Sequence, residues 1–246
     1  ERFGKKIAPV VTPIWDANKK VTGIIDVLNK RAYEMQNLKR VEVEIPADKV
    51  SVVSEFNDAL KESVAETSEE LMDKFFGGED FTYSEMIQGL HQGVKDLSLF
   101  PVLCGSAVNC MGSLMLMDYI VDLLPNPMEG NYQKGVTSDG ETVEFIVSPG
   151  GLPTAFVFKT VSDQDGKYSY IKVFSGTLTA DMSMVNSRTG SSEKLGRLYS
   201  VRGKKVTEVK ELSCGDIGAI GKMDKVKTGD TLCDPRKVVA LKGIPF

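Results

Sequence analysis

The first 45 residues carry the apolar pattern of β-strands. Residues 6–14 and 21–28 are rich in β-branched side chains, and residues 41–45 alternate strictly between an aliphatic residue and glutamate. A period of two places successive side chains on opposite faces of a strand. Pro9 and Pro13 cannot donate to a hydrogen-bond ladder, which is typical of an edge strand. This segment is therefore predicted to be extended.

After Ala47 the apolar period lengthens to that of a helix. Apolar side chains recur every three or four positions over residues 53–64. Residues 67–70 (Thr-Ser-Glu-Glu) and 82–85 (Thr-Tyr-Ser-Glu) fit two capping boxes, each of which begins a further amphipathic helix. The second of these helices carries His91, the only histidine. Since no second ligand lies nearby in the sequence, we expect His91 to be structural.

Residues 100–124 read as a strand, a tight turn and a helix. Residues 100–104 form a short apolar run, and Gly105-Ser-Ala107 supplies the turn. The apolar positions of the expected helix fall in register at Leu114, Met117, Val121 and Leu124. A strand, turn and helix make half of an α/β layer unit, which needs parallel neighbouring strands. Residues 1–99 offer no clear βαβ series, so the unit is expected to belong to a larger sheet.

The second half of the chain shows strands and turns without a helical pattern. Residues 126–152 are rich in Pro, Gly, Asn and Ser and are the best candidate for a linker. Strand-like segments then alternate with glycine-containing turns at residues 154–161, 168–174, 183–186, 194–201, 206–209 and 217–222. Short strands at near-regular spacing imply a closed barrel, which removes exposed sheet edges.

Composition excludes several classes of protein. The 246 residues are 41% hydrophobic and 26% charged, as expected of a protein with a real core. No apolar run approaches the roughly 20 residues of a membrane helix. The net charge of −4 argues against unaided binding to nucleic acid, although residues 1–135 are acidic and residues 136–246 carry 16 Lys/Arg against 13 Asp/Glu. The four cysteines are scattered and form no Cys-x-x-Cys pair, so we expect reduced thiols and no zinc site.

No complete active site is visible in the residues themselves. The sequence contains no Gly-x-x-x-x-Gly-Lys-[Ser/Thr] phosphate loop and no Asn-Lys-x-Asp. The Gly105-Ser-Ala107 turn could expose backbone N–H groups to a base carbonyl or an anion at the carboxyl end of a strand, or could simply be a tight connection. The barrel half carries a basic subset that could contact RNA phosphates or could be ordinary surface charge. Its members are Lys172, Arg188, Lys194, Arg197, Arg202, Lys204 and Lys205.

Several runs of the sequence together resemble elongation factor G. They are Cys104-Gly-Ser-Ala-Val-Asn-Cys-Met-Gly112, the helix ending Asp118-Tyr-Ile-Val-Asp-Leu-Leu-Pro-Asn-Pro127, residues 45–48 and 65–79, and Gly229-Asp-Thr-Leu-Cys-Asp-Pro235. The resemblance is collinear over nearly the whole chain. It implies an α+β multidomain fold: a partial α/β GTPase domain with a helical and stranded insertion subdomain at 1–125, a linker and barrel entry at 126–153, and an antiparallel translation-factor-type β-barrel at 154–246.

The resemblance also implies a role for the tight turn. In the family it is the last of the guanine-nucleotide motifs, so Gly105, Ser106 and Ala107 would line the guanine-base side of a GTP site. The backbone amides and small side chains of Ser106 and Ala107 would help hold the ring. GTP and Mg²⁺ would be cofactors of the parent protein, with the phosphate loop before Glu1. The chain alone is therefore expected to be inactive and to hold no cofactor, catalytic residue or metal.

The barrel of the family faces the small ribosomal subunit. By resemblance, Lys172, Arg197, Arg202 and Lys204 are candidate contacts to the ribosome and its RNA. The parent would be a monomeric, cytoplasmic GTPase, with no membrane attachment, that promotes movement of tRNA and mRNA. The chain reads Arg202-Gly-Lys204 where the family often has His-Ala-Asn, which suggests a divergent paralogue.

Three alternatives stay open. The chain could be a non-enzymatic ribosome- or RNA-binding adaptor that shares the barrel. The parent could recycle or protect ribosomes, although the long helical segment at 47–99 favours the elongation factor branch over ribosome-protection proteins. A hydrolase that uses Cys104 as its nucleophile is the weakest alternative, because no histidine is in place to activate the thiol.

Overall fold

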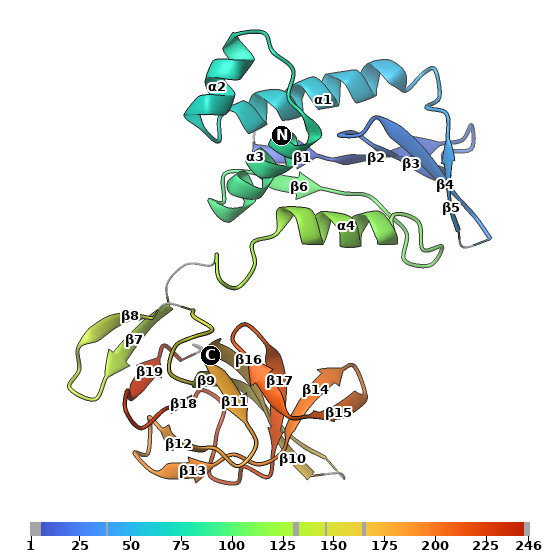
Figure 1. The fold of residues 1–246 in the computed structure, drawn as a ribbon. Coiled ribbons are helices and arrows are strands. Elements are labelled where there is room, and N and C mark those ends of the chain that lie inside the picture. The colour runs from blue at the N-terminus through green and yellow to red at the C-terminus, as the bar shows by residue number, and fades with distance from the viewer. Residues whose placement is uncertain (1–5, 38, 130–132, 146, 164–165, 244–246) are drawn as a thin grey trace. The chain divides into compact units, whose positions relative to one another are not determined.

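The computed structural model describes residues 6–37, 39–129, 133–145, 147–163 and 166–243. It divides into two compact units, Glu1–Pro125 and Asn126–Phe246, which are considered separately (Figure 1). The described chain is mostly β, with four helices, all of them in the first unit.

Antiparallel strands in chain order make up the first sheet of unit 1. β2 (Val11–Trp15), β3 (Val21–Asp26), β4 (Arg31–Gln36) and β5 (Lys39–Val43) pair in the order β2-β3-β4-β5. The expectation of extended structure before residue 46 is therefore confirmed for residues 6–37 and 39–45, although the apolar pattern does not separate β4 from its neighbours. The φ of +52° at Lys30 lies in the tight turn that joins β3 to β4.

A second, smaller sheet in unit 1 is parallel. β1 (Ile7–Pro9) pairs with β6 (Phe100–Val102), with Ile7 opposite Phe100 and Pro9 opposite Val102. These two strands are about 90 residues apart in sequence, and α1 and α4 lie on opposite sides of them (Figure 1). Parallel strands normally lie in sheets covered by helices on both faces. The half-unit expected at residues 100–124 thus has one parallel neighbour, β1.

Three helices occupy the segment expected to be helical: α1 (Val50–Ala65), α2 (Glu69–Phe76) and α3 (Tyr83–Lys95). The capping box of α3 is confirmed, since the Thr82 hydroxyl accepts from the Glu85 amide and the Glu85 carboxylate accepts from the Thr82 amide. The box at 67–70 is wrong. Ser68 caps α2 by accepting from the Leu71 amide, while the Thr67 hydroxyl donates to a carbonyl at the end of α1.

The fourth helix, α4 (Ser113–Leu123), packs through a different face from the one its apolar register suggested. Its buried side chains are Met115, Tyr119 and Leu123. The four apolar residues in register are instead exposed: Leu114, Met117, Val121 and Leu124. The helix is apolar on nearly all sides, so periodicity alone could not select the packed face.

The core of unit 1 joins elements that are distant in sequence. Leu60 from α1, Leu90 from α3, and Met115 and Tyr119 from α4 lie in one buried cluster with residues of the strands. The Tyr119 hydroxyl donates to the buried carboxylate of Asp26 at 2.8 Å. This contact fixes α4 against the end of β3, and so positions the turn that precedes α4.

Unit 2 is an antiparallel, barrel-like fold. Its largest sheet has the order β13-β12-β18-β9-β10-β17-β14-β15, and smaller sheets pair β11 with β16 and β19 with β7 and β8 (Figure 1). The strands are β7 (Gln133–Thr137), β8 (Thr142–Phe145), β9 (Thr154–Asp163), β10 (Gly166–Ser175), β11 (Thr177–Thr179), β12 (Ser183–Asn186), β13 (Ser192–Lys194), β14 (Leu198–Arg202), β15 (Lys205–Val209), β16 (Glu211–Ser213), β17 (Ile217–Gly221), β18 (Thr231–Cys233) and β19 (Val239–Leu241).

Two features of unit 2 differ from the sequence-based prediction. The segment 126–153, expected to be a linker and barrel entry, contains β7 and β8, which belong to unit 2 because β7 pairs with β19 and β8 pairs with β7. The single strand expected at 194–201 is two strands, β13 and β14, separated by Leu195, Gly196 and Arg197. A Cβ at Gly196 would overlap the Gly221 carbonyl oxygen, so the chain can pass this point only as glycine.

Alternate residues of the barrel strands fill two clusters. Ile171 and Val173 of β10 face the main core, together with Leu198 and Ile220. Phe174 belongs to a second cluster formed with the β19–β7–β8 sheet. The outer face of β10 is thereby partly covered: Phe174 is buried, and Tyr168 and Tyr170 are half-buried.

Candidate functional site

The Ser106 turn (residues 104–112) connects β6 to α4. Its two arms form an antiparallel bridge in which the Ser106 amide donates to the Met111 carbonyl at 2.9 Å. A Cβ at Gly105 would lie 2.7 Å from the Met111 oxygen, and one at Gly112, whose φ is +76°, would lie 2.8 Å from the Cys104 oxygen. Both glycines are therefore required for the closed shape of the turn.

The three residues predicted to face a guanine ring do lie together on this turn. Gly105 and Ala107 are exposed and Ser106 is half-buried. The Ser106 amide is already engaged with Met111, whereas the Ala107 amide has no partner among the residues that the structure describes. Of the two amides expected to hold a base, Ala107 is therefore the one available to an external acceptor.

Two adjoining hollows flank the Ser106 turn. One, of about 260 Å³, is lined by the turn and by Leu103 and Leu116. The other, of about 380 Å³, is lined by the turn and by Pro13, Trp15 and Lys20. The Ala107 amide lies beside the smaller of the two hollows.

Trp15 is the residue of this region that the sequence analysis missed. It is the only tryptophan of the chain and is 50% exposed at the end of β2. Its being the only tryptophan was the one signal in the sequence; its exposure is ordinary for a single surface side chain, and Phe76 is more exposed. The position of Trp15 beside Ser106 makes its fluorescence a natural probe of the hollow.

Nothing in the turn resembles a nucleophilic centre. Burial raises the pKa of the Cys104 thiol, which disfavours the reactive thiolate. Across the described residues, no group of three or more His, Cys, Asp or Glu is placed to hold a metal ion. Within the same part of the chain, no helix is both long and apolar enough to span a bilayer.

The four barrel residues proposed to contact RNA do not form one cluster. Lys172 lies on β10 with its ammonium 5.4 Å from the centre of the Phe174 ring. Arg197 precedes β14 and pairs with Glu208 at 3.2 Å. Arg202 and Lys204 lie together at the tip of the β14–β15 hairpin, where both are exposed.

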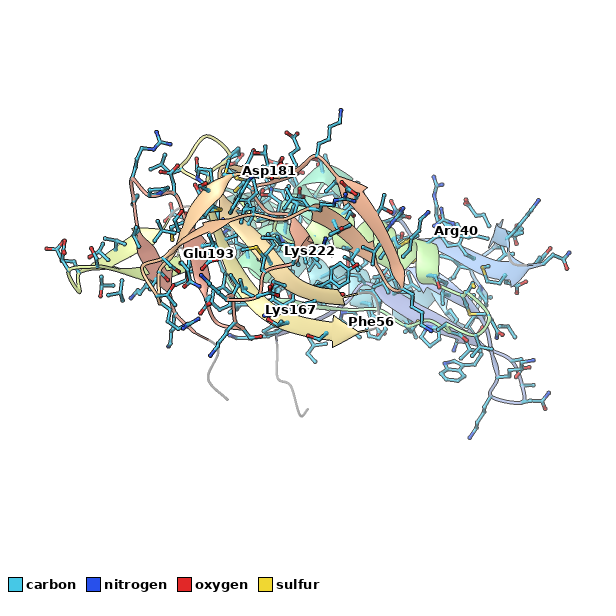
Figure 2. All side chains as sticks on the ribbon, turned by 90° about the horizontal axis from the view of Figure 1, so that it is seen from below. Arg40, Phe56, Lys167, Asp181, Glu193 and Lys222 are labelled. Atoms are coloured by element: carbon cyan, nitrogen blue, oxygen red, sulfur yellow. The ribbon has the colours of Figure 1, made fainter. Side chains whose placement is uncertain are left out.

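Other cations of the barrel are held in internal contacts. The ammonium of Lys167 donates to the Asp224 and Val226 carbonyls at 2.9 and 3.2 Å, and the Lys222 amide donates to the Lys167 carbonyl. Figure 2 shows the labelled Lys167 and Lys222 on neighbouring parts of unit 2. Lys167 therefore has a structural role in closing the loop after β17.

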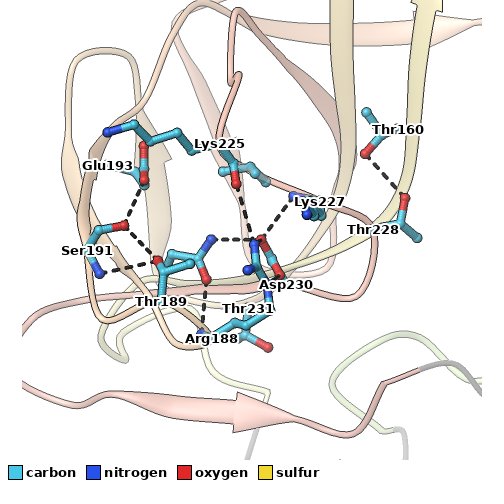
Figure 3. Close-up of polar contacts among 12 residues, drawn as sticks. Thr160, Arg188, Thr189, Ser191, Glu193, Lys225, Lys227, Thr228, Asp230 and Thr231 are labelled. Carbon is cyan, nitrogen blue, oxygen red and sulfur yellow. Dashed lines mark hydrogen bonds and ion pairs between the residues drawn. The ribbon is translucent and has the colours of Figure 1, made fainter.

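A buried carboxylate, Asp230, ties together a third set of polar residues (Figure 3). It accepts from the Asn186 amide group at 2.7 Å, from Arg188 Nε at 2.6 Å and Nη2 at 2.9 Å, and from the Lys227 backbone amide at 2.9 Å. Burial raises the pKa of Asp230, but these donors outweigh it and the net pKa is lowered. Arg188, a member of the basic subset, thus has a structural role in unit 2.

Comparison with known proteins agrees with the barrel. Residues 153–235 match the family described as elongation factor G domain 2. A crystal structure of a protein from Thermus thermophilus superimposes on 98% of this chain with a TM-score of 0.79 and 27% sequence identity. The chain spans about a third of that protein, 34% of its length. Residues 153–235 therefore form a β-barrel of the elongation factor G domain 2 type, and the chain as a whole shares the fold of about a third of the Thermus thermophilus protein.

Proposed function

We propose that this chain is part of a cytoplasmic, ribosome-associated GTPase that promotes the movement of tRNA and mRNA during elongation. The observation that supports this most directly is the Ser106 turn at the carboxyl end of the parallel strand β6, with a hollow of about 260 Å³ beside it. In open α/β sheets, ligands bind outside the carboxyl ends of the strands. The Ala107 amide, which has no acceptor among the described residues, would donate to a base carbonyl.

The chain by itself is proposed not to hydrolyse GTP. Phosphoryl transfer needs backbone amides and a lysine around the phosphates, and Mg²⁺ to neutralise the developing charge. The phosphate loop and the Asn-Lys-x-Asp motif are absent from the 246 residues. In the whole protein, other segments would carry the phosphate loop and the Asn-Lys-x-Asp motif that bind GTP and Mg²⁺. Gly105, Ser106 and Ala107 would line the guanine-base side of that site.

The test uses the single tryptophan as its probe. Trp15 emission is recorded while GDP is added to the chain up to millimolar concentration, with GTP turnover measured in parallel. We expect no turnover and no saturable change below about 1 mM, since a rim of one site supplies only a small part of the binding energy. Saturation at micromolar GDP, or release of phosphate, would contradict this proposal.

The barrel is proposed to contact small-subunit ribosomal RNA, with Arg202 and Lys204 as the best-placed of the four candidates. Cosedimentation of the chain with small ribosomal subunits tests this RNA contact separately from nucleotide binding.

A non-enzymatic adaptor is the second candidate, and the missing phosphate loop is the observation that favours it. The coding sequence upstream of Glu1 discriminates between the two. A phosphate loop in the same reading frame supports the GTPase, while a start codon directly before Glu1 supports the adaptor.

A further inference from the structure

A single buried carboxylate organises the turn in which β3 leads into β4. Asp26 is 5% exposed. Its Oδ1 accepts from the Leu28 and Asn29 backbone amides at 3.0 and 3.1 Å, and its Oδ2 accepts from the Asn29 side-chain amide at 2.8 Å. These three donors belong to the turn itself. We call residues 26–29 the Asp26 anchor.

The fourth donor to Asp26 comes from a distant element. The Tyr119 hydroxyl, 93 residues away on α4, donates to Asp26 Oδ1 at 2.8 Å. Burial, and after it the neighbouring Asp26 carboxylate, raise the pKa of Tyr119, so the hydroxyl keeps the proton that it donates. Hydrogen bonds to an ionised group are about twice as strong as neutral ones. Tyr119 therefore links α4 firmly to the end of β3.

The Asp26 anchor is also fastened to elements other than α4. Asn57 of α1, which is 4% exposed, donates from its side-chain amide to the Val27 carbonyl at 3.0 Å. The Val27 amide donates to the Val10 carbonyl at 3.0 Å. With both backbone groups of Val27 held, the anchor is a fixed point against which α4 is placed.

The Ser106 turn rests on the same strand as Tyr119 does. Ile24 and Asp26 are two positions apart on β3, so they share one face of the sheet. Ile24 Cδ1 lies 3.4 Å from where a Cβ of Gly112, the last residue of the turn, would be. Gly112 and Tyr119 are seven residues apart, close to two helical turns, and so share one face of α4. The turn and α4 are therefore seated together on β3.

We propose that Tyr119 and Asp26 are positioning residues of the guanine-base side: their hydrogen bond holds the Ser106 turn in the closed shape that presents the Ala107 amide. This inference rests on the proposed function, in which that amide faces the base. Neither residue would touch the ligand. Tyr119 acts through α4, whose first turn continues directly from the Ser106 turn, and Asp26 acts through Tyr119.

A neighbouring residue supplies the matched control. Asp118 makes a second polar contact between α4 and the sheet, with its Oδ2 3.6 Å from Nη1 of Arg40 on β5. The two side chains are 67% and 36% exposed. Such a pair contributes little, because water competes for both charges and two long side chains must be ordered. Asp118→Asn therefore removes a contact of the same helix without altering the Asp26 anchor.

Hydrogen exchange of the full chain, followed for each amide by NMR, tests the proposal. The Ser106 amide, bonded to the Met111 carbonyl, reports opening of the turn, while core amides of α1 and α3 report unfolding of unit 1. Ser106 is half-buried, so we expect it to exchange faster than those core amides in wild type. Tyr119→Phe keeps the ring in the core and removes only the hydroxyl. It is expected to speed Ser106 exchange about fivefold, the effect of one net hydrogen bond. Asp118→Asn is expected to leave the rate within about twofold of wild type.

Three results would each overturn the proposal. The first is a Ser106 rate in Tyr119→Phe that stays at the wild-type value, even if α1 and α3 exchange faster, because the bond would then stabilise unit 1 without holding the turn. The second is equal acceleration of Ser106 exchange by Tyr119→Phe and Asp118→Asn. The third is a wild-type Ser106 rate equal to that of the α1 core, because the turn would then have no opening of its own.

The exchange experiment needs no nucleotide, so its outcome is separate from that of the proposed function. If Ser106 exchange responds as expected but GDP binds the chain at micromolar concentration, the positioning role stands and the proposed incomplete site is wrong. If Ser106 exchange does not respond while the GDP titration gives the expected result, the positioning role is wrong and the proposed function stands.

Discussion

Replacement of Asp230 by asparagine is the sharpest test of what holds the barrel together. The Asp230 side chain is 2% exposed and its carboxylate accepts four hydrogen bonds, from Asn186, from Arg188 twice and from the Lys227 amide. An asparagine in the same place keeps one acceptor oxygen but turns an NH₂ group toward these donors. With its oxygen at the Oδ2 position, which accepts three of the four bonds, the asparagine leaves Arg188 Nε facing the NH₂ group and removes the negative charge that pairs with Arg188.

The expected cost follows from which donors can reach water. A buried donor left unpaired costs about 1–3 kcal/mol, and breaking a buried ion pair costs about 3–5 kcal/mol. The Arg188 side chain is 46% exposed, so water can replace part of its contact, while Asn186 is fully buried. We therefore expect Asp230→Asn to destabilise unit 2 by about 3 kcal/mol, near the lower end for a buried pair.

The assay is urea unfolding followed by far-UV circular dichroism. With a slope of about 2 kcal/mol per molar urea, the midpoint is expected to fall by about 1.5 M. Asp181→Asn is the matched control, because Asp181 pairs with Lys194 at 3.0 Å but both side chains are mostly exposed. Such a pair contributes at most about 1 kcal/mol, and the φ of +64° at Asp181 suits asparagine.

The pH dependence of stability is a second test of the Asp230–Arg188 contact. The folded pKa of Asp230 is lowered, so its contribution to stability is full above the unfolded pKa of about 3.9 and is lost as the pH falls through the folded value. The gap between wild type and Asp230→Asn should therefore narrow below about pH 4. A midpoint for Asp230→Asn as high as that of Asp181→Asn, or a gap unchanged at pH 3, would refute this reasoning.

Three further predictions concern unit 1. Leu90→Ala, at a position that is 0% exposed, is expected to cost about 2–4 kcal/mol in urea unfolding followed by Trp15 emission; a loss below 1 kcal/mol would contradict the buried position. Tyr119→Phe removes the donor to Asp26 and is expected to cost about 1 kcal/mol in the same assay, whereas a stabilised variant would show that the contact is not formed. The hydrogen bond from Lys74, followed by those at the N-cap of α3, lowers the pKa of Glu85 to about 2. The contribution of Glu85 to stability is full above its unfolded pKa of about 4.3 and is lost as the pH falls toward 2. Glu85→Gln should therefore lose less stability than wild type between pH 5 and pH 2. An equal loss in both proteins would show that Glu85 does not cause it.

The elements of this chain that were predicted well are those whose signals are local. The capping box of α3 needs only Thr82 and Glu85, three residues apart, and it is present in the structure. The strand, turn and helix at 100–124 were likewise visible, because a short apolar run and a glycine turn are encoded in neighbouring residues. The same holds for the β14–β15 hairpin, whose turn is marked by Gly203 with a φ of +58°.

The errors occurred where a local pattern had two solutions. Thr67 and Ser68 can both cap a helix, and the structure uses Ser68, because the Thr67 hydroxyl donates to the last turn of α1. The apolar residues of α4 could be divided into more than one stripe. Packing against Asp26 and the rest of the core selected the stripe that contains Tyr119.

The sequence by itself determined where most of the chain is extended, helical or turned, because those choices depend on residues a few positions apart; β7 and β8, which lie in the segment expected to be a linker, are the exception. Only the tertiary structure decided that the Ser106 amide donates to the Met111 carbonyl and that Trp15 lines a hollow beside Ser106. It also decided that Arg188 is neutralised by Asp230, 42 residues away. A side chain's availability for binding depends on what it already contacts. Such contacts arise from folding of the whole unit, and no spacing along the chain encodes them.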